Sequence, residues 1–140
     1  MKKSSVYDCT IVQLSKHHRA QGNITVVENG DTIPFDVKRI YYLYDVPGGE
    51  ERGSHAHKAL SQLIIAASGS FSVTLSDGKV NRTFLLNRPY QGLYVVPGIW
   101  RTLDDFSSGS VCLVLGSDLY QKEDYIRNYD EFIEFKGIKE

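Results

Sequence analysis

The sequence is poor in cysteine and contains no long apolar run. Its 140 residues include two cysteines, Cys9 and Cys112, too few for the disulfide framework of a small secreted domain. Cys112 stands in the apolar segment 111–115, which predicts a buried thiol. No stretch approaches the roughly 20 apolar residues that span a bilayer, and residues 1–8 turn polar too early for a signal peptide. We therefore expect a cytoplasmic protein without membrane contact.

The chain also lacks an excess of charge of either sign. Sixteen basic and seventeen acidic residues give a formal net charge of −1, so no broad field attracts nucleic acid. A local basic pocket for a small anion remains compatible with this balance. The sequence has no repeat, low-complexity tract or charged linker. We expect a single domain over residues 1–140, which is enough chain to bury a core.

The sequence does contain several short segments with the residue pattern of β-strands, separated by turn residues. Apolar and hydroxyl side chains alternate over residues 71–75, as in a half-buried strand, and Asp77-Gly78 is a hairpin signal before a second strand at 80–86. Residues 39–46 are rich in aromatic and branched side chains, which favours another strand. Further candidates are residues 24–27, 63–67, 93–96 and 111–115. Strands at this spacing predict a sandwich, jelly roll or barrel.

The C-terminal part of the chain has a different pattern. Ile126, Tyr129 and Ile133 recur at helical spacing among polar residues, which predicts a short amphipathic helix within residues 123–135. Its expected role is to cover one end of the β core.

A pair of histidines two positions apart carries the strongest chemical signal. On a strand, His55 and His57 point to the same face, where two imidazoles can bind a metal or transfer protons near neutral pH. A bare pair of this kind is more often a surface feature. Here the spacing Gly49-x5-His55-x-His57-x4-Gln62-x6-Gly69 resembles the first motif of the cupin superfamily, in which a glutamate stands at the position of Gln62.

The second cupin motif has a counterpart, with altered spacing, in residues 92–101. Its last position, normally a third histidine ligand, is Arg101. Gln62 is a weak neutral donor and an arginine cannot deprotonate to bind a cation, whereas a tight divalent site needs three or four ligands. We therefore predict no metal and no cofactor. The histidines are then free for acid–base chemistry, and Arg101 suits an anionic substrate or a developing enolate.

Five segments together extend the resemblance over nearly the whole chain, from about residue 23 to 135. They are residues 33–42, 52–58, 92–95, 100–101 and 124–130. The sequence resembles the dTDP-4-keto-6-deoxyglucose 3,4-ketoisomerases, the WxcM-like sugar-nucleotide cupins. Segments 52–58 and 124–130 are fairly specific together and weak alone. The resemblance implies an all-β fold, a cupin-type jelly-roll β-barrel with a short C-terminal helix.

The resemblance also implies a reaction. The carbonyl of a dTDP-linked 4-keto-6-deoxyhexose moves from C4 to C3 through an enediol, without a metal, and His55 and His57 are the catalytic acid–base groups. The residues do not decide which histidine serves which carbon. Family products enter the synthesis of 3-amino-3,6-dideoxyhexoses for surface glycans such as lipopolysaccharide O-antigen and the S-layer, and the family implies a homodimer.

Basic and amide side chains near the histidines are candidates for substrate binding. Arg52 is expected to clamp the diphosphate, with a solvated loop charge as the alternative, and the same two interpretations apply to Lys58. Gln62 is expected to hydrogen-bond the sugar. Arg101 either takes part in the chemistry or closes the barrel mouth.

Three aromatic side chains complete the candidate binding residues. Tyr42 and Tyr44 share one strand face and can stack on thymine, with core packing as the alternative. Trp100 either walls the pocket or fills the barrel.

Two other functions fit the same residue types: a cupin-class sugar-nucleotide epimerase, and a non-catalytic cupin that binds a sugar or small effector. The C4 configuration of the product is also open. Some related sequences carry a histidine where this chain has Arg101, and only the histidine can deliver a proton there. The position of Gln21 also varies, and an amide supplies no proton. Both observations favour the gluco product.

Overall fold

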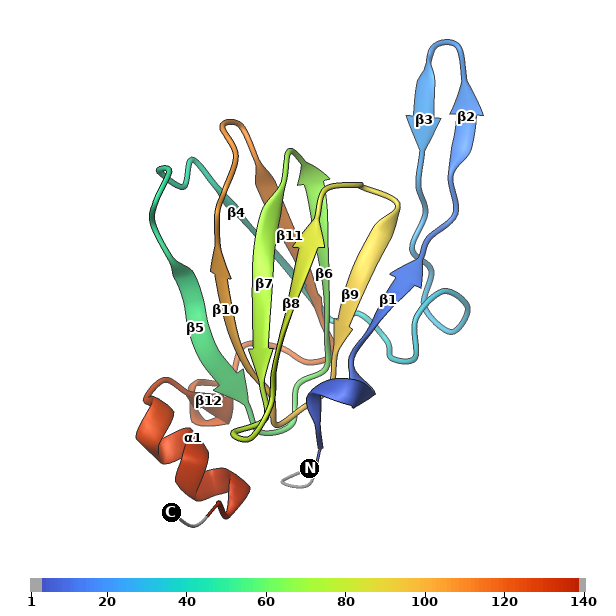
Figure 1. The fold of residues 1–140 in the computed structure, drawn as a ribbon. Coiled ribbons are helices and arrows are strands. Elements are labelled where there is room, and N and C mark those ends of the chain that lie inside the picture. The colour runs from blue at the N-terminus through green and yellow to red at the C-terminus, as the bar shows by residue number, and fades with distance from the viewer. Residues whose placement is uncertain (1–3, 139–140) are drawn as a thin grey trace.

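Two antiparallel five-stranded sheets face each other in the computed structural model, which describes residues 4–138 (Figure 1). The first sheet has the order β1 (Thr10–Gln13), β9 (Gln91–Val95), β6 (Gln62–Ser68), β11 (Val111–Gly116) and β4 (Arg39–Tyr44). The second has the order β12 (Tyr125–Ile126), β5 (Arg52–His57), β10 (Trp100–Asp104), β7 (Phe71–Ser76) and β8 (Asn81–Leu86). The jelly-roll prediction is confirmed.

A hairpin and three short helical segments complete the fold. Strands β2 (His17–Arg19) and β3 (Gly22–Ile24) pair with each other and project beyond both sheets (Figure 1). The short 3-10 segments are η1 (Val6–Asp8) and η2 (Lys122–Asp124), and the α-helix is α1 (Tyr129–Lys136). None of the helices in residues 4–138 is long and apolar enough to cross a membrane.

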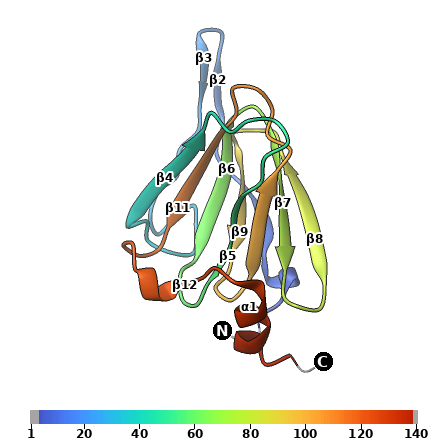
Figure 2. The same cartoon turned by 90° about the vertical axis from the view of Figure 1, so that its left-hand side faces the viewer.

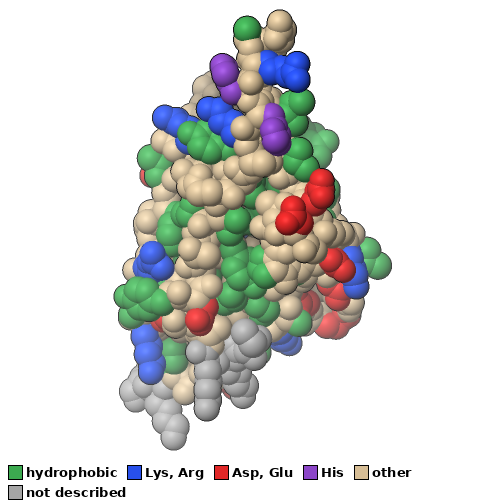
Figure 3. Space-filling model, turned by 90° about the vertical axis from the view of Figure 1, so that its right-hand side faces the viewer, with side chains coloured by type: hydrophobic (Ala, Val, Ile, Leu, Met, Phe, Trp, Pro, Cys, Tyr) green, Lys and Arg blue, Asp and Glu red, His purple; other side chains and the backbone are tan. Residues whose placement is uncertain are grey.

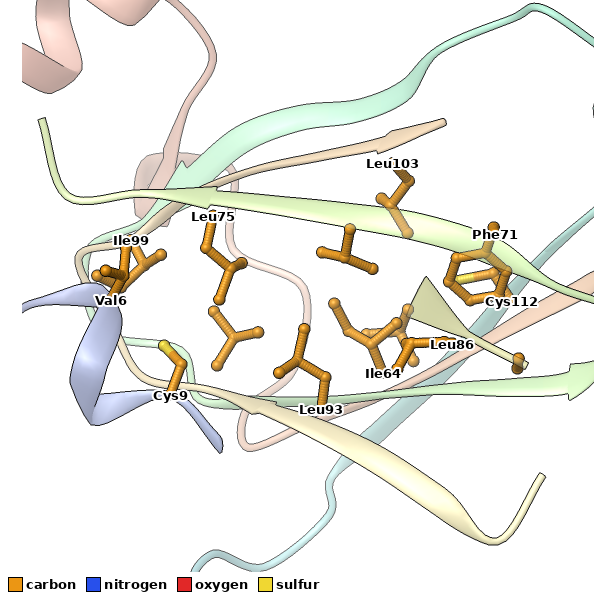
Figure 4. Packing of buried hydrophobic residues seen from close by; sticks show 14 of the residues in the cluster. Val6, Cys9, Ile64, Phe71, Leu75, Leu86, Leu93, Ile99, Leu103 and Cys112 are labelled. Atoms are coloured by element: carbon orange, nitrogen blue, oxygen red, sulfur yellow. The ribbon is translucent and has the colours of Figure 1, made fainter. Parts of the chain in front are cut away.

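The main hydrophobic core lies between the two sheets. The predicted alternation of β7 places Phe71, Val73 and Leu75 inside, all fully buried, where they meet side chains of the first sheet such as Ile64 and Leu93 (Figure 4). Burial of this apolar surface is the main stabilising contribution, at roughly 25 cal/mol per Å². The core also contains the predicted buried thiol of Cys112.

A second apolar layer covers the outer face of the first sheet. Phe35 and Val37 pack there against buried side chains of β6 and β11 such as Leu63 and Leu115. The predicted strand over residues 24–27 is wrong, because β3 ends at Ile24 and the following chain crosses this layer, with Val27 packed into it.

The predicted C-terminal helix is shorter than its sequence pattern. Residues 125–126 form β12 against β5, and α1 begins only at Tyr129. The side chain of Asn128 caps the start of the helix by accepting a hydrogen bond from the Glu131 amide. Buried Phe132 then packs with Ala56 and Ile126, so the helix covers one end of the second sheet as predicted (Figure 2).

Candidate active site

Strand β5 lies between β10 and β12, and its pairing with both assembles the site. Arg101 of β10 stands directly across from His55, and Tyr125 of β12 directly across from His57. The two histidine rings are 4.8 Å apart, on one face of the strand as their spacing predicted. His55 is 6% exposed and His57 and Arg101 are each 1% exposed, so the sequence places three ionisable side chains in the interior of the barrel.

A bulge at Gly53 produces this alignment. His55 pairs with Arg101 and Arg52 pairs with Leu103, so β5 contains one residue more than β10 between the two pairs. Gly53 has a left-handed φ of +66°, and a Cβ there would lie 2.5 Å from Leu103 Cδ1. Glycine is therefore required by both the backbone and the packing.

A cavity of about 530 Å³ lies between β4 of the first sheet and β5 of the second, with residues 120–127 along its margin. Its charged lining residues are Arg39, Arg52, Arg101, Arg127 and Glu51. Four cations against one anion give a strong local excess of positive charge in a chain whose net charge is −1. Guanidinium groups bind phosphate oxygens in bidentate fashion, so the cavity suits an anionic ligand.

Arg101 fixes the protonation state of His55. Its Nη2 and Nε atoms lie 3.0 and 3.3 Å from His55 Nε2, and Nη2 also donates to the Tyr41 hydroxyl at 2.7 Å. Because a guanidinium only donates, Nε2 accepts and neutral His55 carries its proton on Nδ1. Burial, reinforced by the charge of Arg101, lowers the pKa of His55 to about 2.

His57 has a carboxylate partner. Its Nδ1 lies 3.0 Å from Asp124 Oδ2, and its Nε2 is buried without a hydrogen-bond partner among the described residues. Burial and the charge of Arg101 lower the pKa of His57, while Asp124 opposes this shift. Neutral His57 therefore donates from Nδ1 and keeps a lone pair on Nε2.

Tyr125 packs against both histidines. Its ring centre lies 4.3 Å from that of His57 and 5.0 Å from that of His55, and its hydroxyl accepts a hydrogen bond from Arg39 at 3.2 Å. Arg39 and Tyr125 also line a smaller hollow of about 250 Å³ on the side of His57. They thus form the wall between this hollow and the main cavity.

The structure brings several predicted residues to these two hollows. Arg52 lines the main cavity and Lys58 lines the smaller hollow. Gln62 is fully buried at the start of β6, with Oε1 unpartnered in the described part of the chain, and it is not among the residues lining the main cavity. Substrate contact by these three side chains stays a prediction.

Three predicted aromatic side chains lie outside the main cavity. Tyr42 and Tyr44 point to the outer face of β4, where they are 58% and 60% exposed. Side chains alternate along a strand, and Tyr41 is the one that faces the cavity. Tyr42 and Tyr44 line a neighbouring hollow of about 460 Å³ instead. Trp100 likewise faces away from Arg101 and packs against Phe132 of α1.

Sequence reasoning missed five residues that contribute to the site, and Arg39 of β4 is the first of them. Tyr41, the next, lies on the opposite face of β4 from the predicted Tyr42 and Tyr44 and lines the cavity. Asp124, Tyr125 and Arg127 belong to the segment 124–130 that carried the family resemblance, but nothing in the sequence placed that segment beside the histidines. Among the described residues, no group of three or more histidine, cysteine, aspartate or glutamate side chains is arranged to hold a metal ion.

Comparison with known proteins supplies the family. The family model described as "FdtA: WxcM-like, C-terminal" matches residues 7–137. The chain belongs to this family. A family relative from Aneurinibacillus thermoaerophilus, TDP-4-oxo-6-deoxy-alpha-D-glucose-3,4-oxoisomerase, is 43% identical over 122 residues, covering 87% of this chain and 88% of the relative.

Solved structures of other proteins share the fold closely. The sugar 3,4-ketoisomerase QdtA of Thermoanaerobacterium thermosaccharolyticum, in complex with TDP, has a TM-score of 0.92 and 38% identity, covering 94% of this chain and 96% of its own. The TDP-quinovose 3,4-ketoisomerase WlaRB of Campylobacter jejuni has a TM-score of 0.86 and 43% identity, covering 91% of this chain and 98% of its own. A QdtA variant with one histidine replaced by asparagine was solved with TDP-4-keto-6-deoxyglucose. The resemblance inferred from the sequence is confirmed.

Proposed function

We propose that this chain is a sugar-nucleotide 3,4-ketoisomerase that converts dTDP-4-keto-6-deoxyglucose into a dTDP-3-keto-6-deoxyhexose. The observation that carries the proposal is the pair of buried, neutral histidines whose rings lie 4.8 Å apart, with His55 lining, beside Arg101, a cavity that also contains three further arginines. Family relatives with this activity, 38% to 43% identical over most of the chain, support it.

The reaction moves two protons and leaves the overall oxidation state of the sugar unchanged. A base removes the C3 proton while the C4 oxygen takes up a proton, and the electrons shift to give an enediol with hydroxyl groups at C3 and C4. An acid then protonates C4 while the C3 hydroxyl proton leaves, so that the carbonyl stands at C3. His55 and His57 are the acid–base groups, and the Arg101 guanidinium, already paired with the Tyr41 hydroxyl, stabilises negative charge on the enediol oxygens.

The remaining cavity residues bind the rest of the substrate. Arg52 and Arg127 line the cavity, and we assign their guanidinium groups a bidentate contact to the diphosphate. Lys58 follows His57 and lines the same small hollow, and Gln62 is buried at the start of β6. We assign these two side chains polar contacts to the nucleotide and the sugar. The proposed reaction requires no metal ligand at His55, because Arg101 already donates a hydrogen bond to the Nε2 lone pair of that histidine.

The product is assigned the gluco configuration at C4. Arg101 holds its proton at ordinary pH and cannot deliver it to carbon, which leaves the histidine side of the cavity as the proton source. The 43% identity to an enzyme named for TDP-quinovose supports the same assignment. An NMR spectrum of the product reports this configuration directly, and a galacto sugar would contradict it.

The working unit is assigned as a cytoplasmic homodimer. All six residues of the β2–β3 hairpin are exposed, and Figure 3 shows hydrophobic side chains on the molecular face below this hairpin. Packing or exchange of a projecting element between two copies is a low-cost route to a dimer, and we assign this role to the hairpin. The free thiols Cys9 and Cys112 fit a reducing compartment. We assign the product to 3-amino-3,6-dideoxyhexose synthesis for surface glycans, either O-antigen or S-layer.

Incubation with dTDP-4-keto-6-deoxyglucose, followed by carbon NMR of the sugar, tests the activity. A carbonyl signal that moves from C4 to C3 supports the isomerase. A carbonyl that stays at C4 with inverted C5 would identify an epimerase, and unchanged substrate that still binds would identify a non-catalytic cupin.

A further inference from the structure

The two histidines differ in one respect that their spacing does not reveal. Only His57 contacts a carboxylate, that of Asp124, which is 67 positions away in the sequence. His55 instead faces the guanidinium of Arg101. The interior of the site therefore holds one histidine paired with a cation and one paired with an anion.

We propose that Asp124 is a positioning residue that holds His57 in the Nδ1-protonated tautomer, with the lone pair of Nε2 available to accept a proton. The proposal deepens the proposed function and rests on it. Asp124 acts through His57 and need not touch the substrate. The same carboxylate also stabilises the imidazolium that forms when His57 accepts a proton at Nε2.

The backbone holds Asp124 rigidly in this role. Its second carboxylate oxygen, Oδ1, accepts a hydrogen bond from the Ala59 amide at 2.8 Å, and its carbonyl accepts one from the Lys58 amide at 2.9 Å. The next residue, Tyr125, then pairs with His57 in β12. Figure 2 shows this segment crossing from the first sheet to the second. The chain immediately after His57 thus binds Asp124, which in turn binds the His57 ring.

The charges around His57 make the carboxylate the decisive group. Arg101 and Arg39 act on His57 from β10 and β4, both opposing a positive charge on it. His55 and the Tyr125 ring are its other titratable neighbours, on β5 itself and on β12. Asp124 is the acidic group that acts on His57 in the opposite sense. Without it, the charges of Arg101 and Arg39 would oppose an imidazolium at this position with no carboxylate hydrogen-bonded to the ring.

Replacing Asp124 with asparagine tests the assignment with little change in shape. The amide keeps an oxygen for the Ala59 amide, but its NH₂ donates to Nδ1 of His57 and so selects the opposite tautomer, with the proton on Nε2. We expect D124N to lower kcat by about 10²- to 10⁴-fold, the usual cost of a misplaced acid–base group, with KM changed by less than about threefold.

Asp118→Asn is the matched control. Asp118 lines the same small hollow, but within residues 4–138 its carboxylate hydrogen-bonds the local groups of Leu119 and Gln121 and no histidine. D118N should keep wild-type kcat and KM. A conservative D124E variant, which retains the carboxylate, should recover more of kcat than D124N.

Nitrogen-15 NMR of the histidine rings gives a readout that a merely structural role would not move. In wild-type protein, both His55 and His57 should carry the proton on Nδ1, and in D124N only His57 should switch to Nε2, with H57N assigning its signal. Wild-type kcat in D124N, or an unchanged His57 tautomer, would overturn the proposal. Absence of isomerase activity in the wild type would refute the proposed function instead, while the tautomer measurement would still test the role of Asp124.

Discussion

His55 and His57 have the same type of side chain and lie on the same strand, but their hydrogen-bond partners give them different chemistry. The guanidinium of Arg101 donates to Nε2 of His55, whereas the carboxylate of Asp124 accepts a hydrogen bond from Nδ1–H of His57. Both imidazoles are held neutral in the interior, but the Nε2 lone pair of His55 is engaged by Arg101, whereas that of His57 has no partner among the described residues. The different proton-transfer properties of the two histidines are therefore determined by residues on β10 and on the segment before β12.

Asparagine at either histidine should abolish most turnover without abolishing binding. The change roughly keeps size and polarity but removes proton transfer, so His55→Asn and His57→Asn should each lower kcat by about 10²- to 10⁴-fold. Affinity for dTDP, measured by calorimetry, should stay close to wild type because the cavity arginines remain. A variant with near-normal kcat would remove that histidine from the mechanism.

Acid should destabilise the protein through its buried histidines. The folded-state pKa of His55 is lowered from 6.5 to about 2, so below pH 6.5 the unfolded chain binds a proton that the folded chain does not. Stability is then lost as pH falls, by about 2 kcal/mol between pH 7 and pH 5 for one such histidine. Urea unfolding at fixed protein concentration should show that H55N loses about 2 kcal/mol less than wild type over this interval. Equal losses would show that His55 is charged in the native state.

Single elements were predicted from sequence with uneven success, for physical reasons. The alternation of β7 and the hairpin turn after it fixed that strand pair, since local periodicity and turn chemistry agree there. The two residues of β12 carry no such periodicity and form a strand only because β5 offers an edge. The inner face of β4 was also undetermined, because tyrosines occupy consecutive positions on both faces and only the tertiary fold selects Tyr41 for the cavity.

The bulge in β5 gives a prediction at this scale. Gly53→Ala places a Cβ at a left-handed φ and against Leu103 Cδ1, so we expect a loss of about 2 to 4 kcal/mol in the free energy of unfolding and a fall in kcat as His55 shifts from Arg101. Gly109→Ala is the matched control, because Gly109 has a similar φ of +73° and no atom within 4 Å of the added Cβ. Equal destabilisation of the two variants would show that packing at the bulge is unimportant.

At the scale of the whole molecule, the sequence supported the fold class and the histidine centre, because both rest on patterns within short segments. The contact between His57 and Asp124, and the four arginines around one cavity, depend on segments far apart in the chain. The composition alone could not reveal the anionic-ligand site, since the overall charge is balanced and the positive excess is local to the cavity. The family resemblance included the segment 124–130 but gave Asp124 no role.

The projecting hairpin leads to a prediction about assembly. Light scattering coupled to size-exclusion chromatography should give about twice the chain mass of 15.8 kDa. A variant in which a short Gly-Ser link replaces residues 17–24 should shift toward the single-chain mass, since these residues are exposed and pair only with each other in one chain. A wild-type mass of one chain would contradict the homodimer.

The central claim is that the histidine pair moves protons between C3 and C4 of the bound sugar. The most direct measurement is turnover of dTDP-4-keto-6-deoxyglucose in heavy water, with proton NMR of each sugar position, for the wild type and H55N. The account predicts a 3-keto product that carries deuterium at C4 for the wild type, and substrate that stays essentially unchanged for H55N over the same time. Deuterium at C5 with the carbonyl still at C4, or full wild-type turnover by H55N, would contradict it.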